Sequence, residues 1–404
     1  MSEETKVQHL IAKDSMQDEL IDFINYVFHM NGKDDDFYRM LPKLYKREYH
    51  PCRYNYVTLE NNRIVAAVGS FPGEVEIAGT TLSYYGIGNV AVNPYCRSKG
   101  YMKQLMNMAV EDMKKKDVDF TLLTGRRNRY SYFSYEVVGR RYQLWLDESN
   151  IKHSAEGKSN RSFRFHKVKE EDIELISAIA DLHNRQSFHY VRPVDKVFDI
   201  MLTWQASIFS IHEGESFAGY FILYENSIKE FYLEHPEQVK KVVADFVTTA
   251  YQEEGTFLQE NFKEGNPFRQ GIIFELPEFQ RNYIDDISEL AEHVSIHVAE
   301  NFSVFHYCKV LEPLFRLKAS QDMIPDGEVV LLIHGAKSEE RLLIKSSNRE
   351  VSVTTTDRDY DYEFSHKEAM EILFGNYSPS RNKLSLLMQT WFPLPIYIFP
   401  ADLV

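Results

Sequence analysis

A short basic loop, Arg97 to Gly100, joins a strand-like run to an amphipathic helix. A helix N-terminus offers unpaired N–H groups and a positive dipole, which is an environment in which phosphates bind. Arg97 can hold a phosphate through two parallel N–H bonds, Lys99 adds a point charge, and Gly100 lets the backbone come close. The same residues could also form an ordinary basic strand-to-helix turn. The pattern indicates a phosphate-bearing ligand and leaves both interpretations open.

The elements around this loop are those that must position it. The strand-like run Ile87–Val92 ends before Pro94, which cannot extend a strand interior. Apolar residues recur at helical spacing over Met102–Met113, and Lys114–Lys116 end the helix where cations suit its dipole. Val118–Thr124 follows as the next strand. Strand, glycine-bearing turn, helix and strand in this order are typical of a βαβ unit.

Further elements are expected on both sides of this unit. Before it we expect helices over Leu20–Phe28 and Phe37–Tyr45, and strands over Tyr54–Leu59, Ile64–Ser70 and Glu74–Ile77. After it, the polar stretch Asp147–Ser162 has few large apolar residues and reads as a linker. Beyond the linker we expect helices over Ile173–Leu182, Pro236–Tyr251 and Lys367–Leu373, and strands within Ile208–Tyr224 and over Glu328–His334, Glu339–Lys345 and Glu350–Thr355. The alternation predicts an α/β (α+β) protein with mixed sheets.

Composition bounds the class of protein. The chain has 404 residues, of which 44% are hydrophobic and 26% charged, and this length exceeds one hydrophobic core, so two or three domains are expected. The sequence has no apolar run of about 18 residues that would predict a membrane span, and its polar start lacks the apolar core of a signal peptide. Cys52, Cys96 and Cys308 lie far apart. We therefore expect a cytoplasmic protein without disulfides or a membrane partner.

The charge balance bears on the partners. The chain has 46 Lys and Arg against 60 Asp and Glu, a formal net charge of -14. Such a surface repels nucleic acid and attracts a small cationic molecule, such as a polyamine or an aminoglycoside, although the charge could also serve solubility alone. The 14 histidines show no metal-ligand spacing, so no metal site is predicted.

The basic loop and its flanks resemble the acetyl-CoA motif of the GNAT superfamily, Arg/Gln-x-x-Gly-x-Gly/Ala after a V-x-V-x-P strand. The sequence departs from the motif at Met102, where the superfamily usually has a small residue, and one subgroup shares this substitution. The resemblance implies acetyl-CoA as co-substrate, with its pantetheine along the strand and its pyrophosphate on the loop. The implied cofactor-binding residues are Val90, Ala91, Val92, Arg97, Ser98, Lys99, Gly100, Tyr101, Met102, Lys103, Gly125 and Arg126.

Tyr130 lies where GNAT enzymes place a tyrosine beside the CoA sulfur, shortly after the next strand. When the thioester breaks, CoA leaves as a thiolate and needs a proton. A thiolate whose conjugate pKa is about 8.5 can take one from a phenol near 10 only if the phenol is well positioned. The resemblance therefore implies that Tyr130 is the general acid. The neighbouring Tyr132, Phe133 and Tyr135 are expected to serve packing.

The pattern Tyr-x-x-Phe-x-Tyr at Tyr130 also resembles the enhanced intracellular survival (Eis) acetyltransferases, which join two GNAT-like domains to a sterol-carrier-protein-like domain. Leu311–Ala319, followed by Pro325–Glu328, resembles the start of that last domain. The resemblance implies an acetyl-CoA-binding GNAT domain over 1–147, a degenerate GNAT-like domain over 163–301 and a sterol-carrier-protein-like domain over 302–404. The second domain lacks the motif and is expected not to bind CoA. A homo-oligomer, for example a hexamer, is also implied.

In the Eis family the terminal carboxylate serves as general base in the first domain. Here that carboxylate belongs to Val404, and the apolar run Trp391–Pro400 favours a buried tail, which could instead merely pack in the third domain. Asp34, Asp35 and Asp36, which border the acceptor pocket in GNAT folds, could hold an ammonium group or form a solvated loop. We expect an N-acetyltransferase that acts directly on a primary amine. The alternative is a non-catalytic acyl-CoA or lipid-binding module.

Overall fold

The computed structural model describes residues 6–30, 36–251, 261, 267–376 and 378–404, which divide into two compact units. Unit 1 consists of Met1–Gly139, Glu300–Ile396 and Leu403–Val404. Unit 2 consists of Arg140–Ala299 and Tyr397–Asp402. The domain boundaries inferred above remain a prediction: unit 1 combines residues of the first and third predicted domains, and unit 2 holds most of the second.

The main sheet of unit 1 has the strand order β1-β2-β3-β4-β5-β13, of which β13 contributes its last residues. Its strands are β1 (Val7–Ile11), β2 (Asn55–Glu60), β3 (Arg63–Ile77), β4 (Thr80–Val92), β5 (Phe120–Leu123) and β13 (His293–Val304). The strand β1 was not predicted from the sequence. The two strands expected over Ile64–Ser70 and Glu74–Ile77 are parts of the single strand β3. The pairs β1–β2, β2–β3 and β3–β4 are antiparallel, whereas β4 and β5 are parallel.

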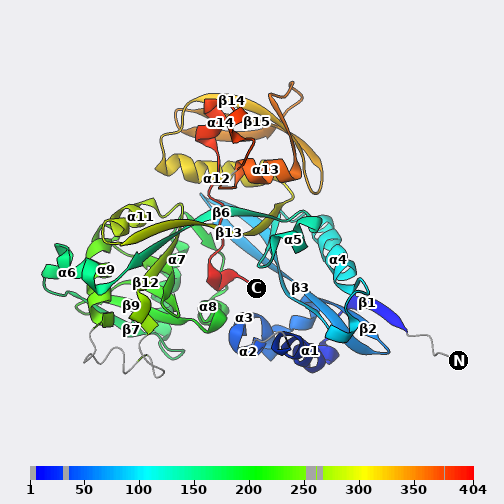
Figure 1. Cartoon of the computed structure of the whole chain (residues 1–404), viewed down its shortest axis with the longest axis horizontal. Helices are drawn as coiled ribbons and strands as arrows, with labels where there is room; N and C mark the ends of the chain where they lie inside the picture. Colours follow the sequence, from blue (N-terminus) through cyan, green and yellow to red (C-terminus); the bar gives the residue numbers. More distant parts are fainter. Residues whose placement is uncertain (1–5, 31–35, 252–260, 262–266, 377) are drawn as a thin grey trace. The chain divides into compact units, whose positions relative to one another are not determined.

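Helices cover both faces of this sheet (Figure 1). They are α1 (Gln17–His29), α2 (Phe37–Met40), α3 (Pro42–Tyr45), α4 (Tyr101–Lys115) and α5 (Arg127–Tyr130). The predicted helix over Phe37–Tyr45 is wrong as a single element, because Leu41 precedes Pro42 and leaves the helical region of backbone conformation. The predicted amphipathic helix after the basic loop is confirmed as α4, which buries Leu105, Met106, Ala109, Val110 and Met113.

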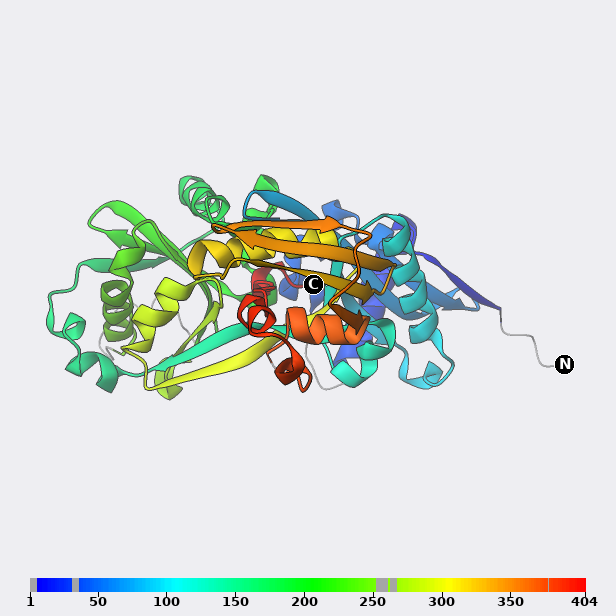
Figure 2. The same cartoon turned by 90° about the horizontal axis from the view of Figure 1, so that it is seen from above.

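The C-terminal part of unit 1 forms a second sheet of four strands in the order β16-β15-β14-β17, which run side by side (Figure 2). They are β14 (Gly327–His334), β15 (Glu339–Ser347), β16 (Glu350–Thr355) and β17 (Tyr362–Ser365). The helices of this part are α12 (Tyr307–Gln321), α13 (His366–Leu373) and α14 (Leu386–Trp391). The predicted strands β14, β15 and β16 and the predicted helix α13 are confirmed within two residues at each end.

Unit 2 contains a sheet in the order β6-β12-β11-β10-β9-β7. The strands of this sheet are β6 (Glu136–Leu146, shared with unit 1), β7 (Phe163–Lys167), β9 (Ser207–Glu213), β10 (Ser216–Tyr224), β11 (Ser227–Leu233) and β12 (Ile272–Pro277). Unit 2 also contains the short strand β8 (Phe188–Tyr190), which lies outside this order. Its helices are α6 (Glu148–His153), α7 (Ile173–Asn184), α8 (Val197–Met201), α9 (Val239–Tyr251) and α11 (Arg281–Ser288).

The linker predicted over Asp147–Ser162 is wrong in its first half, where α6 forms. Asp147 accepts a hydrogen bond from the Asn150 N–H, and the Asn150 side chain accepts one from the Asp147 N–H. This capping box starts a helix in a segment of low hydrophobicity. Ile151 is then the buried residue of α6.

Candidate functional site

The strands β4 and β5 separate within unit 1, so that the last residues of β4 are not paired with β5. They pair only from Tyr84 to Ile87 on β4, whereas β4 continues to Val92. The register of β4 against β3 shifts at the same point, so that Asn89 and Val90 face the single residue Val68, and Asn89 has φ +41°. A bulge turns a strand away from its neighbour. The backbone of Gly88–Val92 is thus placed to hydrogen-bond an extended amide chain, and it contains the predicted residues Val90, Ala91 and Val92.

The basic loop joins β4 to α4 through two left-handed residues. The short 3-10 turn Pro94–Cys96 is capped by the Asn93 side chain, Ser98 has φ +65°, and Gly100 has φ +81° as the N-cap of α4. No side chain caps α4, so the N–H groups of its first turn point out of the helix end. Arg97, Ser98, Lys99 and Gly100 are all exposed. The loop therefore presents the expected geometry for an anion at a helix N-terminus.

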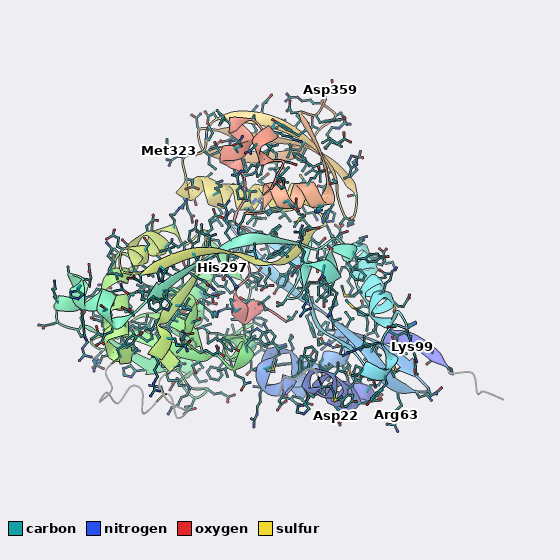
Figure 3. All side chains as sticks on the ribbon, viewed as in Figure 1. Asp22, Arg63, Lys99, His297, Met323 and Asp359 are labelled. Atoms are coloured by element: carbon teal, nitrogen blue, oxygen red, sulfur yellow. The ribbon has the colours of Figure 1, made fainter. Side chains whose placement is uncertain are left out.

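A carboxylate that the sequence did not suggest, Glu60 at the end of β2, joins this loop. It accepts a hydrogen bond from Lys99 at 2.6 Å and another from the Tyr101 hydroxyl. The hydrogen bond from Lys99, and after it that from Tyr101, keep the pKa of Glu60 below its usual value. Figure 3 shows Lys99 at the surface of unit 1. Its side chain is 46% exposed. The Lys99 ammonium is thus partly neutralised, which increases the weight of the N–H groups of the first turn of α4 in binding an anion.

The next predicted residues on α4 lie beside the loop after β5. Met102 packs against the core of unit 1, and the Lys103 ammonium lies 4.5 Å above the Tyr132 ring. Tyr132 is 65% exposed, so the expectation that it serves packing is wrong. The Tyr132 ring instead forms a cation–π contact with Lys103, and such a contact can form at an exposed site. Tyr135 is fully buried and its hydroxyl lies 2.9 Å from the Thr121 hydroxyl, so its packing role is confirmed.

Tyr130 ends α5 and lies 5% exposed in the core formed by β4, β5 and α4. Its ring packs on Gly125, where a Cβ atom would lie 2.4 Å from the ring, so residue 125 must lack a side chain. The Asn301 side chain donates to the Gly125 carbonyl at 3.0 Å and fixes this turn. Burial raises the pKa of the Tyr130 phenol, and the Arg129 charge opposes this rise. The phenol therefore stays protonated at neutral pH, as a proton donor must.

The predicted residue Arg126 lines an open depression of about 960 Å³ whose wall includes Ser134 and His366. The His366 Nε2 lies 2.9 Å from the Ser134 carbonyl, and Nδ1 lies 3.2 Å from the Ala336 N–H. These partners fit a neutral ring that donates through Nε2 and accepts through Nδ1. Burial lowers the pKa of His366 to about 4, which keeps the ring neutral. His366 thus ties α13 to the turn that follows Tyr130.

The C-terminal residue Val404 lies against β4 beside the strand separation. A Cβ atom on Gly88 would lie 2.9 Å from the Val404 carboxyl carbon, and one on Gly86 would lie 2.5 Å from Val404 Cγ2. Side chains alternate along a strand, so Val404 is on the face opposite to Ile87, which shares the core with Tyr130. Tyr130 belongs to the same core cluster as Ile87, whereas Val404 lies against Gly86 and Gly88 on the other face of β4. The structure thus brings both predicted residues to the region of β4, on its two faces, although 273 residues lie between them in the sequence.

Unit 2 has a similar separation of two parallel strands, but there side chains bind the main-chain groups next to it. The parallel strands β11 and β12 pair only at Ser227 and Ile228, and the register of β11 against β10 shifts directly afterwards. Gln280 donates to the Phe231 carbonyl at 3.0 Å, and the Leu233 N–H donates to the Tyr283 hydroxyl at 3.0 Å. These buried bonds use main-chain groups of β11 that are the counterparts of Gly88–Val92 in unit 1.

Two further expectations concern amine and metal sites. Asp34 and Asp35 lie outside the described residues, and Asp36 caps α2 by accepting from the Tyr38 N–H at 3.1 Å. Within the described ranges, no three His, Cys, Asp or Glu side chains converge as a metal site would require. Over the same ranges, every helix is too short or too polar to cross a membrane.

Comparisons with known proteins bear on this arrangement. Residues 11–138 match the acetyltransferase (GNAT) domain family. Three solved structures share the fold over almost the whole chain. A GCN5-related N-acetyltransferase from Kribbella flavida has TM-score 0.63 at 13% identity, covering 99% of each chain. A GCN5-related N-acetyltransferase from Anabaena variabilis has TM-score 0.64 at 13% sequence identity. The match covers 99% of this chain and 100% of that chain. Eis1 from Mycobacterium abscessus has TM-score 0.59 at 11% sequence identity, and the match covers 98% of each chain.

No curated protein sequence matches significantly. At the identities above, the three structural likenesses establish a shared mixed α/β fold. The matched segment contains β4, the basic loop, α4 and Tyr130. It is a GNAT acetyltransferase domain, and this match supports an N-acetyltransferase activity of the chain. GNAT domains use acetyl-CoA as acyl donor, so the expected co-substrate agrees with the domain family.

Proposed function

We propose that unit 1 binds acetyl-CoA along the open edge of β4 and transfers its acetyl group directly to a primary amine. The observation that carries this proposal is the Val404 carboxylate against Gly88 of β4, with Tyr130 in the core on the other face of the same strand. The main chain of Gly88–Val92 would hold the pantetheine amides, and the first turn of α4 with Arg97 would hold the pyrophosphate. Unit 2 is not the acetyl-CoA site in this proposal, since Gln280 and Tyr283 occupy the corresponding main-chain groups of β11.

The residues of the chain then have distinct roles in the transfer. Acetyl-CoA supplies the acetyl group as a thioester. The Val404 carboxylate takes a proton from the acceptor ammonium, and the free amine attacks the acetyl carbonyl carbon. The new C–N bond forms, the C–S bond breaks, and Tyr130 gives its proton to the departing sulfur. The second proton of the amine nitrogen leaves through solvent, from which the Tyr130 phenolate is protonated again, so the products are the amide and the free CoA thiol. Each group lies on its own face of β4, which separates the base on the amine side from the acid on the sulfur side.

The acceptor in this proposal is a small cationic amine, such as an aminoglycoside, a polyamine or a peptide amine. The net charge of -14 favours a cation, and the terminal carboxylate supplies a negative group beside the acetyl site. We further propose an Eis-like protein, which the likeness to Eis1 over 98% of the chain supports. A sterol-carrier-protein-like segment over 302–404, a homo-oligomeric state and a cytoplasmic location belong to the same proposal.

The direct test is release of free thiol from acetyl-CoA in the presence of aminoglycosides, polyamines and peptide amines. We expect turnover with at least one cationic primary amine and none with its tertiary counterpart, which cannot keep an acetyl group. Tyr130→Phe is the matched control, because it removes only the proton donor. Thiol release that is independent of every amine tested, or turnover that survives in Tyr130→Phe, would contradict the proposal.

A further inference from the structure

Unit 2 contains a buried ion cluster around Arg192 that the transfer chemistry does not use. The Arg192 guanidinium donates two bonds to Glu230, at 2.9 and 2.7 Å, and two to Asp402, at 3.0 and 2.8 Å. The three side chains are at most 5% exposed. The guanidinium fork thus holds one carboxylate on β11 and one on the C-terminal tail, and both contacts are bidentate.

The surroundings of the cluster hold Glu230 firmly. The Tyr220 hydroxyl donates to Glu230 at 2.5 Å, and His183 Nδ1 lies 3.3 Å from the same carboxylate. His183 is fixed in turn by the Tyr190 carbonyl, 3.0 Å from its Nε2. Burial alone would raise the pKa of Glu230, but the Arg192 charge and the hydrogen bonds of His183 and Arg192 lower it, so the carboxylate stays ionised.

Stability alone does not account for such a cluster. Burying two carboxylates with one guanidinium has a large desolvation cost, and apolar residues of similar volume often stabilise a fold as well or better. What the ion cluster provides over an apolar contact is a fixed position and orientation of its members. Here the member of interest is Asp402, because Leu403 and Val404 come directly after it.

The tail is also held before Asp402. The Tyr190 hydroxyl donates to the Tyr397 carbonyl at 2.8 Å, and both groups are buried. Phe399 packs edge-on against Phe188, with ring centroids 6.4 Å apart. Between Asp402 and Val404 the chain can extend about 7 Å at most, so a fixed Asp402 restricts the terminal carboxylate to a small volume. Leu403 is 8% exposed, which restricts it further.

We propose that Arg192 and Glu230 are positioning residues that hold Asp402 and thereby set the place of the Val404 carboxylate for proton abstraction. This inference rests on the proposed role of Val404 as general base. In this proposal Arg192 and Glu230 act only through Asp402. Their contribution is to limit the motion of a base that stands at a chain end, where a backbone usually frays.

The test compares Asp402→Asn and Arg192→Lys with the parent enzyme. Asn keeps the shape of Asp402 but loses its charge, and Lys keeps the charge of Arg192 but loses the fork. We expect kcat to fall about 10- to 100-fold in both variants, the effect of misplacing a catalytic group by about 1 Å, while the acetyl-CoA Kd stays unchanged. Glu275→Gln is the matched control: Glu275 is buried in the same unit, accepts from Gln143 at 3.0 Å, and has no contact with the tail among the described residues. This control should lose stability and keep its kcat.

An enzyme extended by one glycine after Val404 separates this inference from the proposed function. If the extension abolishes turnover while folded Asp402→Asn and Arg192→Lys keep the parent kcat, the positioning role is overturned and the base role stands. If the extended enzyme keeps full turnover, the carboxylate is not the base, and the positioning role is overturned with it. If Asp402→Asn is too unstable to assay, Arg192→Lys decides, because it keeps the cluster charged.

Discussion

Replacing Gly88 by alanine is the smallest change that displaces the proposed base. The new Cβ would lie 2.9 Å from the Val404 carboxyl carbon and 3.2 Å from its oxygen, whereas ordinary contacts begin at 3.4 Å. The carboxylate must therefore retreat by about 0.5 to 1 Å, since the β4 backbone is held by β3. Misplacement of that size costs about 10²-fold in rate, or about 2.7 kcal/mol of transition-state stabilisation. We expect kcat to fall by this factor and the acetyl-CoA Kd to stay constant.

Gly86 provides the matched control for this prediction. A Cβ atom there would meet Val404 Cγ2 at 2.5 Å, a side-chain atom rather than the carboxylate. Steady-state thiol release is measured for Gly86→Ala and Gly88→Ala, each alone and combined with Val404→Ala. Shortening Val404 should restore the activity of Gly86→Ala and leave Gly88→Ala impaired. Full kcat in folded Gly88→Ala, or its complete rescue by Val404→Ala, would show that the position of the carboxylate does not govern turnover.

Three further predictions concern the acid, the anion site and the turn after Tyr130. Tyr130→Phe should lower kcat by about 10²–10⁴-fold with unchanged acetyl-CoA affinity, and calorimetry together with thiol release checks both. Gly100→Asp introduces a side chain at φ +81° and a negative charge at the helix N-terminus, so calorimetry should show much weaker acetyl-CoA binding without loss of the fold. Because burial lowers the pKa of His366 to about 4 from 6.5, the unfolded chain takes up a proton in this window that the folded chain does not. Stability should fall by up to about 3 kcal/mol as pH drops from 6.5 to 4, and His366→Gln should reduce this slope in thermal unfolding; an identical slope would refute the assignment.

The sequence predicted the elements around the basic loop because their signals are local. Pro94 ends a strand, Gly100 marks a left-handed position, and α4 has a regular apolar face, so each can be recognised within a few residues. The roles given to Tyr130 and Val404 came from resemblance to a family. The structure adds that Tyr130 lies in the core on one face of β4 and that Val404 lies on the other face, where Gly88 has no side chain.

Other features could not be predicted because they depend on long-range partners. Glu60 binds Lys99 across 39 residues, and Arg192 binds Asp402 across 210 residues, with no spacing pattern in either case. The register shift of β4 follows from its pairing with β3 rather than from a local motif. The helix α6 was missed for a different reason: its capping box is local, but the low hydrophobicity of the segment outweighed it in the sequence interpretation.

The central claim is that the C-terminal carboxylate acts as the base in an acetyl transfer carried out by unit 1. The most direct measurement replaces that carboxylate by a primary amide through ligation of a synthetic C-terminal peptide, with an otherwise identical ligated acid as control. The amide has nearly the same shape and occupies the same place against Gly88, but it cannot take a proton at neutral pH. We predict that the amide enzyme binds acetyl-CoA with the affinity of the control and loses at least about 10²-fold in kcat. An amide enzyme that turns over at the rate of the ligated acid would contradict the account.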